Sequence, residues 1–98
     1  MIYVDEVQTL PFKGKLKKFR HMIADSSRDL AIMAERLKLL PEWIQNKGTV
    51  EEHYDLFGVK IHQILLYKQD VILLDSKEFI KRIQKKRDHD GLLQEVVK

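Results

Sequence analysis

The sequence contains no cysteine, only two prolines and four glycines, and only short runs of apolar residues. Without cysteine it has no disulfide framework, no thiolate nucleophile and no cysteine-ligated zinc site. Its apolar runs fall far below the roughly 18 residues that a membrane-spanning helix needs. The start, MIYVDEVQTL, lacks the basic and long apolar regions of a signal peptide. These absences predict a soluble protein located in the cytoplasm.

The chain has 98 residues, of which 44% are hydrophobic and 34% are charged, and its formal net charge is +3. This length allows one hydrophobic core without metal or disulfide support, so we expect one domain over residues 1–98. The positive charge gathers in two runs, which are either phosphate-binding surfaces or solvated faces of a loop and a helix. The runs are Lys13, Lys15, Lys17, Lys18 and Arg20, and Lys81, Arg82, Lys85, Lys86 and Arg87.

Hydrophobic periodicity predicts about four strands and about three helices. The strands are expected at 2–7, 19–25, 53–57 and 71–75. The first helix begins with the capping box SSRD, carries an apolar stripe of Leu30, Met33, Ala34 and Leu37, and ends at Pro41. The others are expected over 59–68 and from Ser76 to 88–91. Residues 11–18 are expected to form a basic loop, and residues 88–98 an apolar tail that packs on the domain or on a partner.

Strands that alternate with helices predict a three-layer α/β domain with a mostly parallel sheet. In such a sheet the C-terminal strand ends meet at one edge, where ligands bind. Four aspartates follow this pattern, because each lies at or near the end of a different predicted strand. They are Asp5, Asp25, Asp55 and Asp75. Helix capping is the structural alternative for the aspartates that precede a serine, and it is favoured for Asp75 more than for Asp25.

Four short segments occur in an order that resembles a small bacterial and phage family described only as a domain of unknown function. They are Y-V-D at 3–5, H-M-I-A-D at 21–25, DLAIMAERLKL with the following Trp43, and H-Y-D at 53–55. The resemblance covers the chain to about residue 80, and the basic insertion KGKLKKF departs from it. It implies a phage or prophage origin, where small proteins often serve anti-defence roles, and it brings no reaction. It also implies a polar signature of Asp5, His21, Asp25, His53, Tyr54 and Asp55.

The carboxylates and imidazoles of this signature suit Mg²⁺, Mn²⁺ or Zn²⁺. On a strand, His53 and Asp55 point to one face and Tyr54 to the other. The candidate metal ligands are Asp5, Asp25, His53 and Asp55, and His21 or His53 is the candidate general acid or base. No spacing matches a known metal motif, and histidines hydrogen-bonded at strand ends are the structural alternative.

Phosphate or nucleotide binding without catalysis is a second interpretation. Helix N-termini near residues 27, 59 and 77 would present N–H groups at the same sheet edge. Lys60 lies beside one of them, Tyr54 and Trp43 can stack on a base, and basic side chains on the expected loop can close over phosphates. For Trp43 the alternative is a partly buried wedge after Pro41. Nucleic-acid motifs are missing from the sequence, so the basic runs predict at most salt-sensitive, non-specific contact.

We therefore expect a small ligand-binding protein that holds a nucleotide-like or phosphate-bearing molecule, without a cofactor, and acts as a homo-oligomer. Sequestering a host defence signalling nucleotide in the host cytoplasm is one concrete form of this hypothesis. The alternative is a metal-dependent phosphoesterase or nuclease that uses the Asp/His cluster. The predicted ligand-binding residues are Asp5, Arg20, His21, Asp25, Trp43, His53, Tyr54, Asp55 and Lys60.

Overall fold

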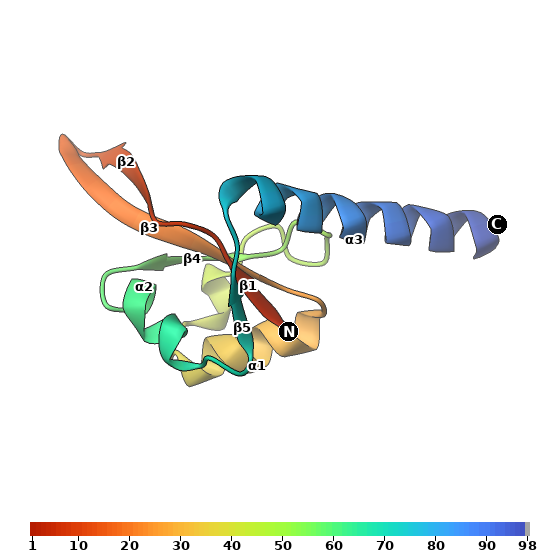
Figure 1. Ribbon diagram of the computed structural model, residues 1–98, viewed down its shortest axis with the longest axis horizontal. Helices are drawn as coiled ribbons and strands as arrows, with labels where there is room; N and C mark the ends of the chain where they lie inside the picture. The colour runs from red at the N-terminus through yellow and green to blue at the C-terminus, as the bar shows by residue number, and fades with distance from the viewer. Residues whose placement is uncertain (98) are drawn as a thin grey trace.

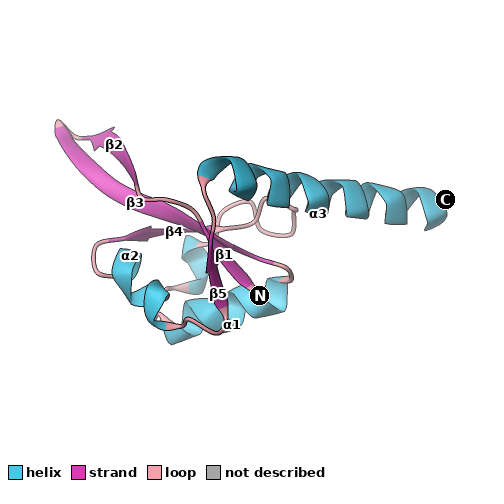
Figure 2. Cartoon of the chain, in the orientation of Figure 1, coloured by secondary structure: helices cyan, strands magenta, loops and turns pink. Residues whose placement is uncertain are grey.

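A mixed sheet forms the centre of the protein, with helices on both of its faces (Figures 1 and 2). The computed structural model describes the backbone of residues 1–97 and the side chains of residues 1–88. Within that part of the chain the sheet has five strands. They are β1 (Ile2–Val4), β2 (Gln8–Phe12), β3 (Lys15–Ala24), β4 (Tyr54–Phe57) and β5 (Val71–Leu73).

The long strand β3 organises the sheet, because three other strands pair with it. Met22 of β3 pairs with both Val4 of β1 and Tyr54 of β4, so β1 and β4 lie along opposite edges of β3. β2 pairs with the first half of β3, along the same edge of β3 with which β1 pairs further on. All three pairings are antiparallel, whereas β5 pairs with β1 in parallel.

The predicted fold is therefore wrong in two respects, since the sheet is mostly antiparallel and has five strands instead of four. The reason is the segment 11–18, which forms a β-hairpin and not the expected loop. Lys13 (φ 49°) and Gly14 (φ 76°) both adopt left-handed backbone conformations. A two-residue turn of this kind matches the twist of the two strands and reverses the chain directly. Consequently, the C-terminal ends of the strands do not meet at one edge.

The helices follow the expected order with different bounds. α1 (Ser27–Arg36) is capped by the Ser26 hydroxyl, which accepts a hydrogen bond from the Asp29 N–H, and it buries Leu30 and Met33 as its apolar stripe predicts. The predicted helix 59–68 is a short α2 (Lys60–Gln63) that continues as a 3₁₀ turn, η2 (Ile64–Leu66). A further 3₁₀ turn, η1 (Pro41–Trp43), follows α1.

The last helix, α3 (Ser76–Val97), continues beyond the predicted end at 88–91 and includes most of the expected tail. The expected packing of that tail on a partner concerns side chains that lie outside the described residues. Among the residues that the structure describes, no helix is both long enough and apolar enough to cross a bilayer.

Alternate residues of the strands face two different environments. The larger cluster packs β1, β3 and β4 against α1 through Val4, Met22, Leu56 and Leu30. On the opposite face, Tyr3 and Ile23 pack against Phe79 of α3. His21 and Asp55 are a cross-strand pair in register with this second face, because residues two apart on a strand point the same way. The polar signature, apart from Tyr54, therefore lies on the α3 side of the sheet.

Candidate functional site

Asp5 occupies an irregularity where β1 passes into β2. Val4 pairs with Met22 and Gln8 pairs with Phe19, so residues 5–7 lie opposite only two residues of β3. One extra residue on one strand is a β-bulge, a feature that redirects side chains and is frequent beside functional sites. The Asp5 residue is only 2% exposed. A buried carboxylate of this kind needs hydrogen-bond donors.

His21 supplies two of those donors. Asp5 Oδ1 accepts the His21 backbone N–H at 2.7 Å, and Asp5 Oδ2 lies 2.6 Å from His21 Nδ1. Gln8 Nε2 donates to Asp5 Oδ2 at 2.8 Å. Because an ionised carboxylate only accepts, Nδ1 of His21 carries a proton. The hydrogen bond to Asp5 raises the pKa of His21, against the effect of burial, and the charges of Asp5 and Asp55 raise it further.

His53 is oriented in the same way by a backbone carbonyl. Its Nδ1 lies 2.8 Å from the Glu51 carbonyl oxygen, which can only accept, so Nδ1 donates. In its neutral form the lone pair of His53 is therefore on Nε2. That atom lies 3.4 Å from Asp55 Oδ1, and His21 Nε2 lies 3.8 Å from the same oxygen. Both imidazoles thus turn their Nε2 atoms toward one carboxylate oxygen.

Asp55 Oδ1 is the oxygen on which this arrangement converges. Within the described residues it is buried and has no hydrogen-bond partner, while Asp55 Oδ2 accepts from Gln45 Nε2 at 2.6 Å. Three lone-pair atoms that face one another repel unless a cation lies between them. A proton on His21 Nε2 would make an ion pair with this oxygen, but 3.8 Å is too long for a hydrogen bond, so Asp55 Oδ1 still lacks a hydrogen-bond donor among the described residues.

The three atoms fit a divalent metal ion. His21, His53 and Asp55 each offer a ligand atom within 4.8 Å of the other two. Ligands at about 2.0–2.1 Å in a tetrahedral site are about 3.3 Å apart, so the two Nε2–Oδ1 separations of 3.4 and 3.8 Å need a small contraction, and the third separation is within 4.8 Å. Asp5 accepts a hydrogen bond from the other ring nitrogen of His21, Nδ1, as carboxylates commonly do for metal-bound histidines. Three protein ligands leave a coordination position for water or substrate.

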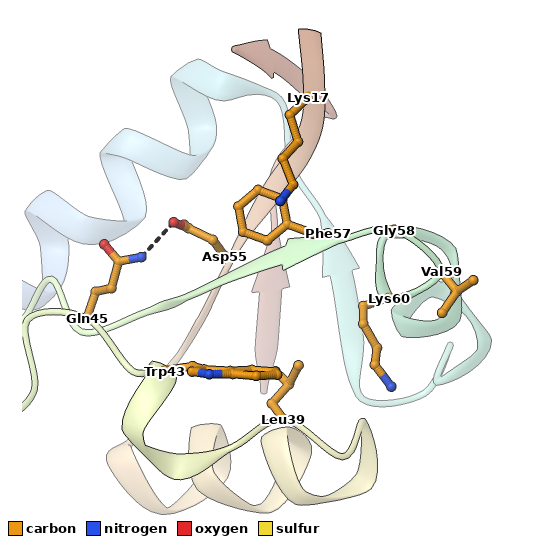
Figure 3. A pocket seen from close by; sticks show the side chains of 9 residues that line it. All are labelled: Lys17, Leu39, Trp43, Gln45, Asp55, Phe57, Gly58, Val59 and Lys60. Atoms are coloured by element: carbon orange, nitrogen blue, oxygen red, sulfur yellow. Dashed lines mark hydrogen bonds between the residues drawn. The ribbon is translucent and has the colours of Figure 1, made fainter. Parts of the chain in front are cut away.

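Two cavities adjoin this cluster. His21 and His53 line one of about 280 Å³, together with Asp5, Glu51 and Phe79. Asp55 lines the larger, about 710 Å³, which is shown in Figure 3. Its wall consists of Lys17, Leu39, Trp43, Gln45, Asp55, Phe57, Gly58, Val59 and Lys60. The candidate metal ligands therefore lie between two spaces that a substrate can occupy.

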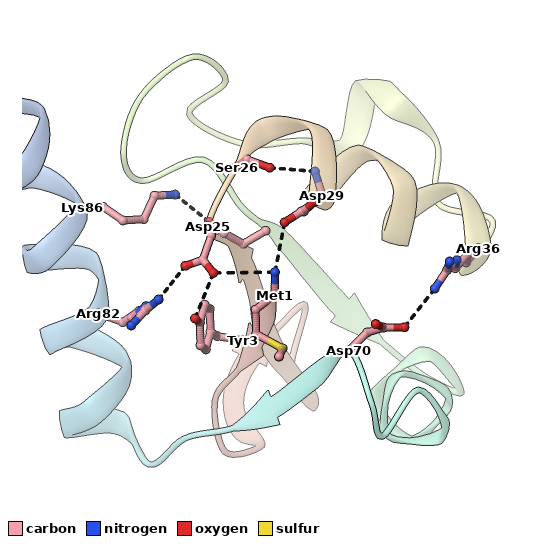
Figure 4. Close-up of polar contacts among 10 residues, drawn as sticks. Met1, Tyr3, Asp25, Ser26, Asp29, Arg36, Asp70, Arg82 and Lys86 are labelled. Carbon is pink, nitrogen blue, oxygen red and sulfur yellow. Dashed lines mark hydrogen bonds and ion pairs between the residues drawn. The ribbon is translucent and has the colours of Figure 1, made fainter.

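Asp25, another predicted ligand, belongs to a different set of contacts (Figure 4). It accepts hydrogen bonds from Tyr3 Oη at 3.1 Å and Arg82 Nη2 at 2.7 Å. Along β3 it is four residues from His21, which corresponds to about 13 Å of extended strand. These contacts join the end of β3 to α3. Burial alone would raise the pKa of Asp25, but the hydrogen bonds from Arg82 and Tyr3 outweigh this effect, so the pKa is lowered.

The remaining predicted ligand-binding residues divide between the two faces. Tyr54 is 4% exposed and packs in the α1-side core, opposite His53 and Asp55. Arg20 is also buried, and its Nη1 donates to the Ile61 carbonyl at 3.0 Å. Trp43 is 53% exposed, so it is only partly buried, and with Lys60 it lines the larger cavity.

Sequence reasoning missed the residues that orient the cluster. Gln8 donates a hydrogen bond to Asp5, and Gln45 donates one to Asp55. Phe57, which was also missed, lines the larger cavity. An isolated glutamine carries no signal in a sequence, because its importance comes from the bulge or loop that brings it to a carboxylate. Phe57 was detectable, since it continues the alternation of His53 and Asp55 along β4.

A family model described as protein of unknown function (DUF4031) matches residues 2–86. Searches of curated proteins and of solved structures found no match.

Proposed function

We propose that this chain, which belongs to the DUF4031 family, is a metal-dependent phosphoesterase. Its divalent ion would be held by His21 Nε2, His53 Nε2 and Asp55 Oδ1. The observation that carries the proposal is the convergence of two oriented imidazoles on a buried carboxylate oxygen without a hydrogen-bond partner among the described residues. Such an arrangement costs free energy unless a cation completes it.

The neighbouring side chains favour hydrolysis of a phosphate ester over other metal chemistry. Two histidines and one carboxylate also hold Fe²⁺ in oxygenases. Here, however, Lys17 and Lys60 line the adjoining cavity and provide cations for a phosphate group. When bound, the ion would supply an activated water and polarise the phosphoryl oxygen. Asp5 keeps His21 in the tautomer that such binding requires.

Titration of the apo protein with Zn²⁺ and Mn²⁺ in a calorimeter tests the ligand set. We expect one ion per chain, with binding lost in His53→Ala and Asp55→Ala. His62→Ala is the matched control, because His62 is exposed on α2 and lies outside the cluster. Circular dichroism checks that each variant is folded. Binding in folded His53→Ala as tight as in the wild type would contradict the proposal.

Hydrolysis of bis(p-nitrophenyl) phosphate tests the activity. We expect turnover in the metal-loaded wild type, none in His53→Ala, and loss on addition of a chelator that the metal restores. Turnover that persists unchanged in the chelator would exclude the proposed chemistry.

The larger cavity favours a second candidate, a protein that holds a nucleotide-like molecule without cleaving it. Trp43 and Phe57 offer aromatic surface, and Lys17 and Lys60 offer positive charge, in a space of about 710 Å³. Sequestration of a defence signalling nucleotide by a phage protein, alone or as a homo-oligomer, belongs to this proposal. Heating the purified protein would then release an intact nucleotide that mass spectrometry identifies. Metal-dependent turnover together with an empty cavity would favour the phosphoesterase instead.

A further inference from the structure

The hairpin of β2 and β3 extends away from the body of the protein (Figure 1). It also carries a concentration of positive charge. We call residues 8–19 the arm. Its four lysines are exposed, and no acidic residue occurs between Val7 and Arg20. A surface with four cations and no anion attracts polyanions. The lysines are Lys13, Lys15, Lys17 and Lys18.

One face of the arm leads directly to the candidate metal ligands. Lys15 pairs with Phe12, Lys17 pairs with Leu10, and His21 pairs with Asp55. Because residues two apart on β3 share a face, Lys15 and Lys17 lie in the same row as His21. A chain molecule bound along this row would therefore extend past Phe19 to the larger cavity, which Lys17 and Asp55 both line.

In this row Lys17 lies between two aromatic rings of the neighbouring strands. Lys17 Nζ lies 4.4 Å from the Phe57 ring centroid and 5.2 Å from that of Phe12. Phe12 is 51% exposed, and Phe57 lines the larger cavity beside Trp43. Exposed rings next to lysines are the features with which proteins bind single strands, because bases stack on the rings while cations hold the phosphates.

We infer that the arm binds single-stranded nucleic acid and leads one of its phosphodiesters to His21, His53 and Asp55. Single-stranded DNA or RNA is then the substrate class of the proposed phosphoesterase. The cleavage part rests on the proposed function, whereas the binding part does not. An anionic membrane is the other polyanion that lysines with exposed apolar side chains attract. It explains neither the position of Lys17 between two rings nor the continuation of the row to the metal ligands.

Fluorescence anisotropy with labelled oligothymidylate and oligouridylate of about 20 nucleotides, in a chelator, measures binding without cleavage. We expect the affinity to fall as the salt concentration rises. In a plot of log affinity against log salt concentration, each phosphate that a lysine contacts should make the slope steeper by about 0.7. Lys15→Ala/Lys17→Ala should weaken binding at least tenfold and reduce the slope by about 1.4. Phe12→Ala should weaken binding about tenfold with little change in slope.

Lys68→Ala/Lys77→Ala is the matched control, because both lysines are exposed and lie outside the arm. It should bind like the wild type. Equal weakening in the control and arm variants would overturn the inference. So would tighter binding to a duplex of the same length, or binding to phosphatidylserine vesicles and not to the oligonucleotides.

The two proposals can fail separately. In the chelator the metal-free wild type should itself bind the strand, since none of residues 8–19 is a candidate metal ligand. A protein that takes up metal but binds no oligonucleotide would refute the role of the arm and leave the metal site intact. A protein that binds the strand through the arm but takes up no metal would refute the phosphoesterase and leave the arm intact.

Discussion

At the scale of single residues, the contact between Asp5 and His21 decides the chemistry available at the site. Asp5 is buried and accepts three hydrogen bonds, two of them from His21. The hydrogen bond to Asp5 raises the pKa of His21 most, burial alone would lower it, and the negative charge of Asp5 raises it further. Replacing this single carboxylate should therefore change how His21 titrates.

We expect Asp5→Asn to lower the pKa of His21, because asparagine keeps a hydrogen-bond acceptor but removes the negative charge. NMR titration of the imidazole signals in the metal-free protein measures this directly. Asp70→Asn is the control, since Asp70 pairs with Arg36 at the surface. An unchanged His21 titration in Asp5→Asn would show that Asp5 is not the cause.

The same pKa shift predicts how stability depends on pH. A histidine whose pKa in the folded state exceeds its ordinary value of 6.5 stabilises the fold fully below that value. The contribution is lost as pH rises from 6.5 through the raised pKa. In urea denaturation of the metal-free protein, the midpoint should thus decrease over this range. The decrease should be smaller in Asp5→Asn, and an equal decrease in both would contradict the assignment.

At the scale of elements, the N-terminal ends of α1 and α3 show how a capping side chain decides where a helix begins. The Ser26 hydroxyl caps α1, as the motif SSRD predicts. For α3 the cap is Asp75, because its Oδ1 accepts the Glu78 N–H at 2.8 Å. Ser76, from which the sequence predicts the last helix, is the first residue of that helix. The capping alternative for Asp75 therefore agrees with its position in the structure.

We expect Asp75→Ala to lower the free energy of unfolding by about 1 kcal/mol, the usual cost of losing an N-cap side chain. Ser76→Ala should change it by less than about 0.5 kcal/mol, since this serine is exposed. Urea denaturation of both variants measures the difference. A larger loss in Ser76→Ala than in Asp75→Ala would place the cap one residue later.

At the scale of the whole molecule, the hydrophobic core is concentrated on the face of the sheet opposite the candidate site. Leu30, Met33 and Leu37 of the first helical segment pack there against Met22 and Leu56. The α3 side has a smaller apolar cluster of Tyr3, Ile23 and Phe79. This division lets polar residues occupy one face while the other supplies most of the apolar burial.

We expect Leu30→Ala to cost about 2–5 kcal/mol of unfolding free energy, because Leu30 is fully buried in the larger cluster. Leu66→Ala should cost less than about 0.5 kcal/mol, since Leu66 is 76% exposed. Chemical denaturation compares the two variants. Similar losses in both would show that the stability does not come mainly from this core.

Sequence patterns predicted what depends on near neighbours in the chain. The spacing of Leu30 and Met33 predicted the buried side of α1, and alternation predicted that His53 and Asp55 share a face opposite Tyr54. The direction of the strands was predicted wrongly. The turn at Lys13 and Gly14 lacks the Asn-Gly or Asp-Gly signal that marks a hairpin of this type.

The sequence by itself determined the cap of α1, the apolar stripes and the alternation of side chains, because each depends on residues a few positions apart. It also indicated the polar residues from which a site can be built. Only the tertiary structure decided which of them meet. Antiparallel pairing of β3 with β4 places His21 opposite Asp55, and the bulge after β1 brings Asp5 to His21. These contacts depend on strand register and direction, which arise from packing across the whole sheet and not from local spacing.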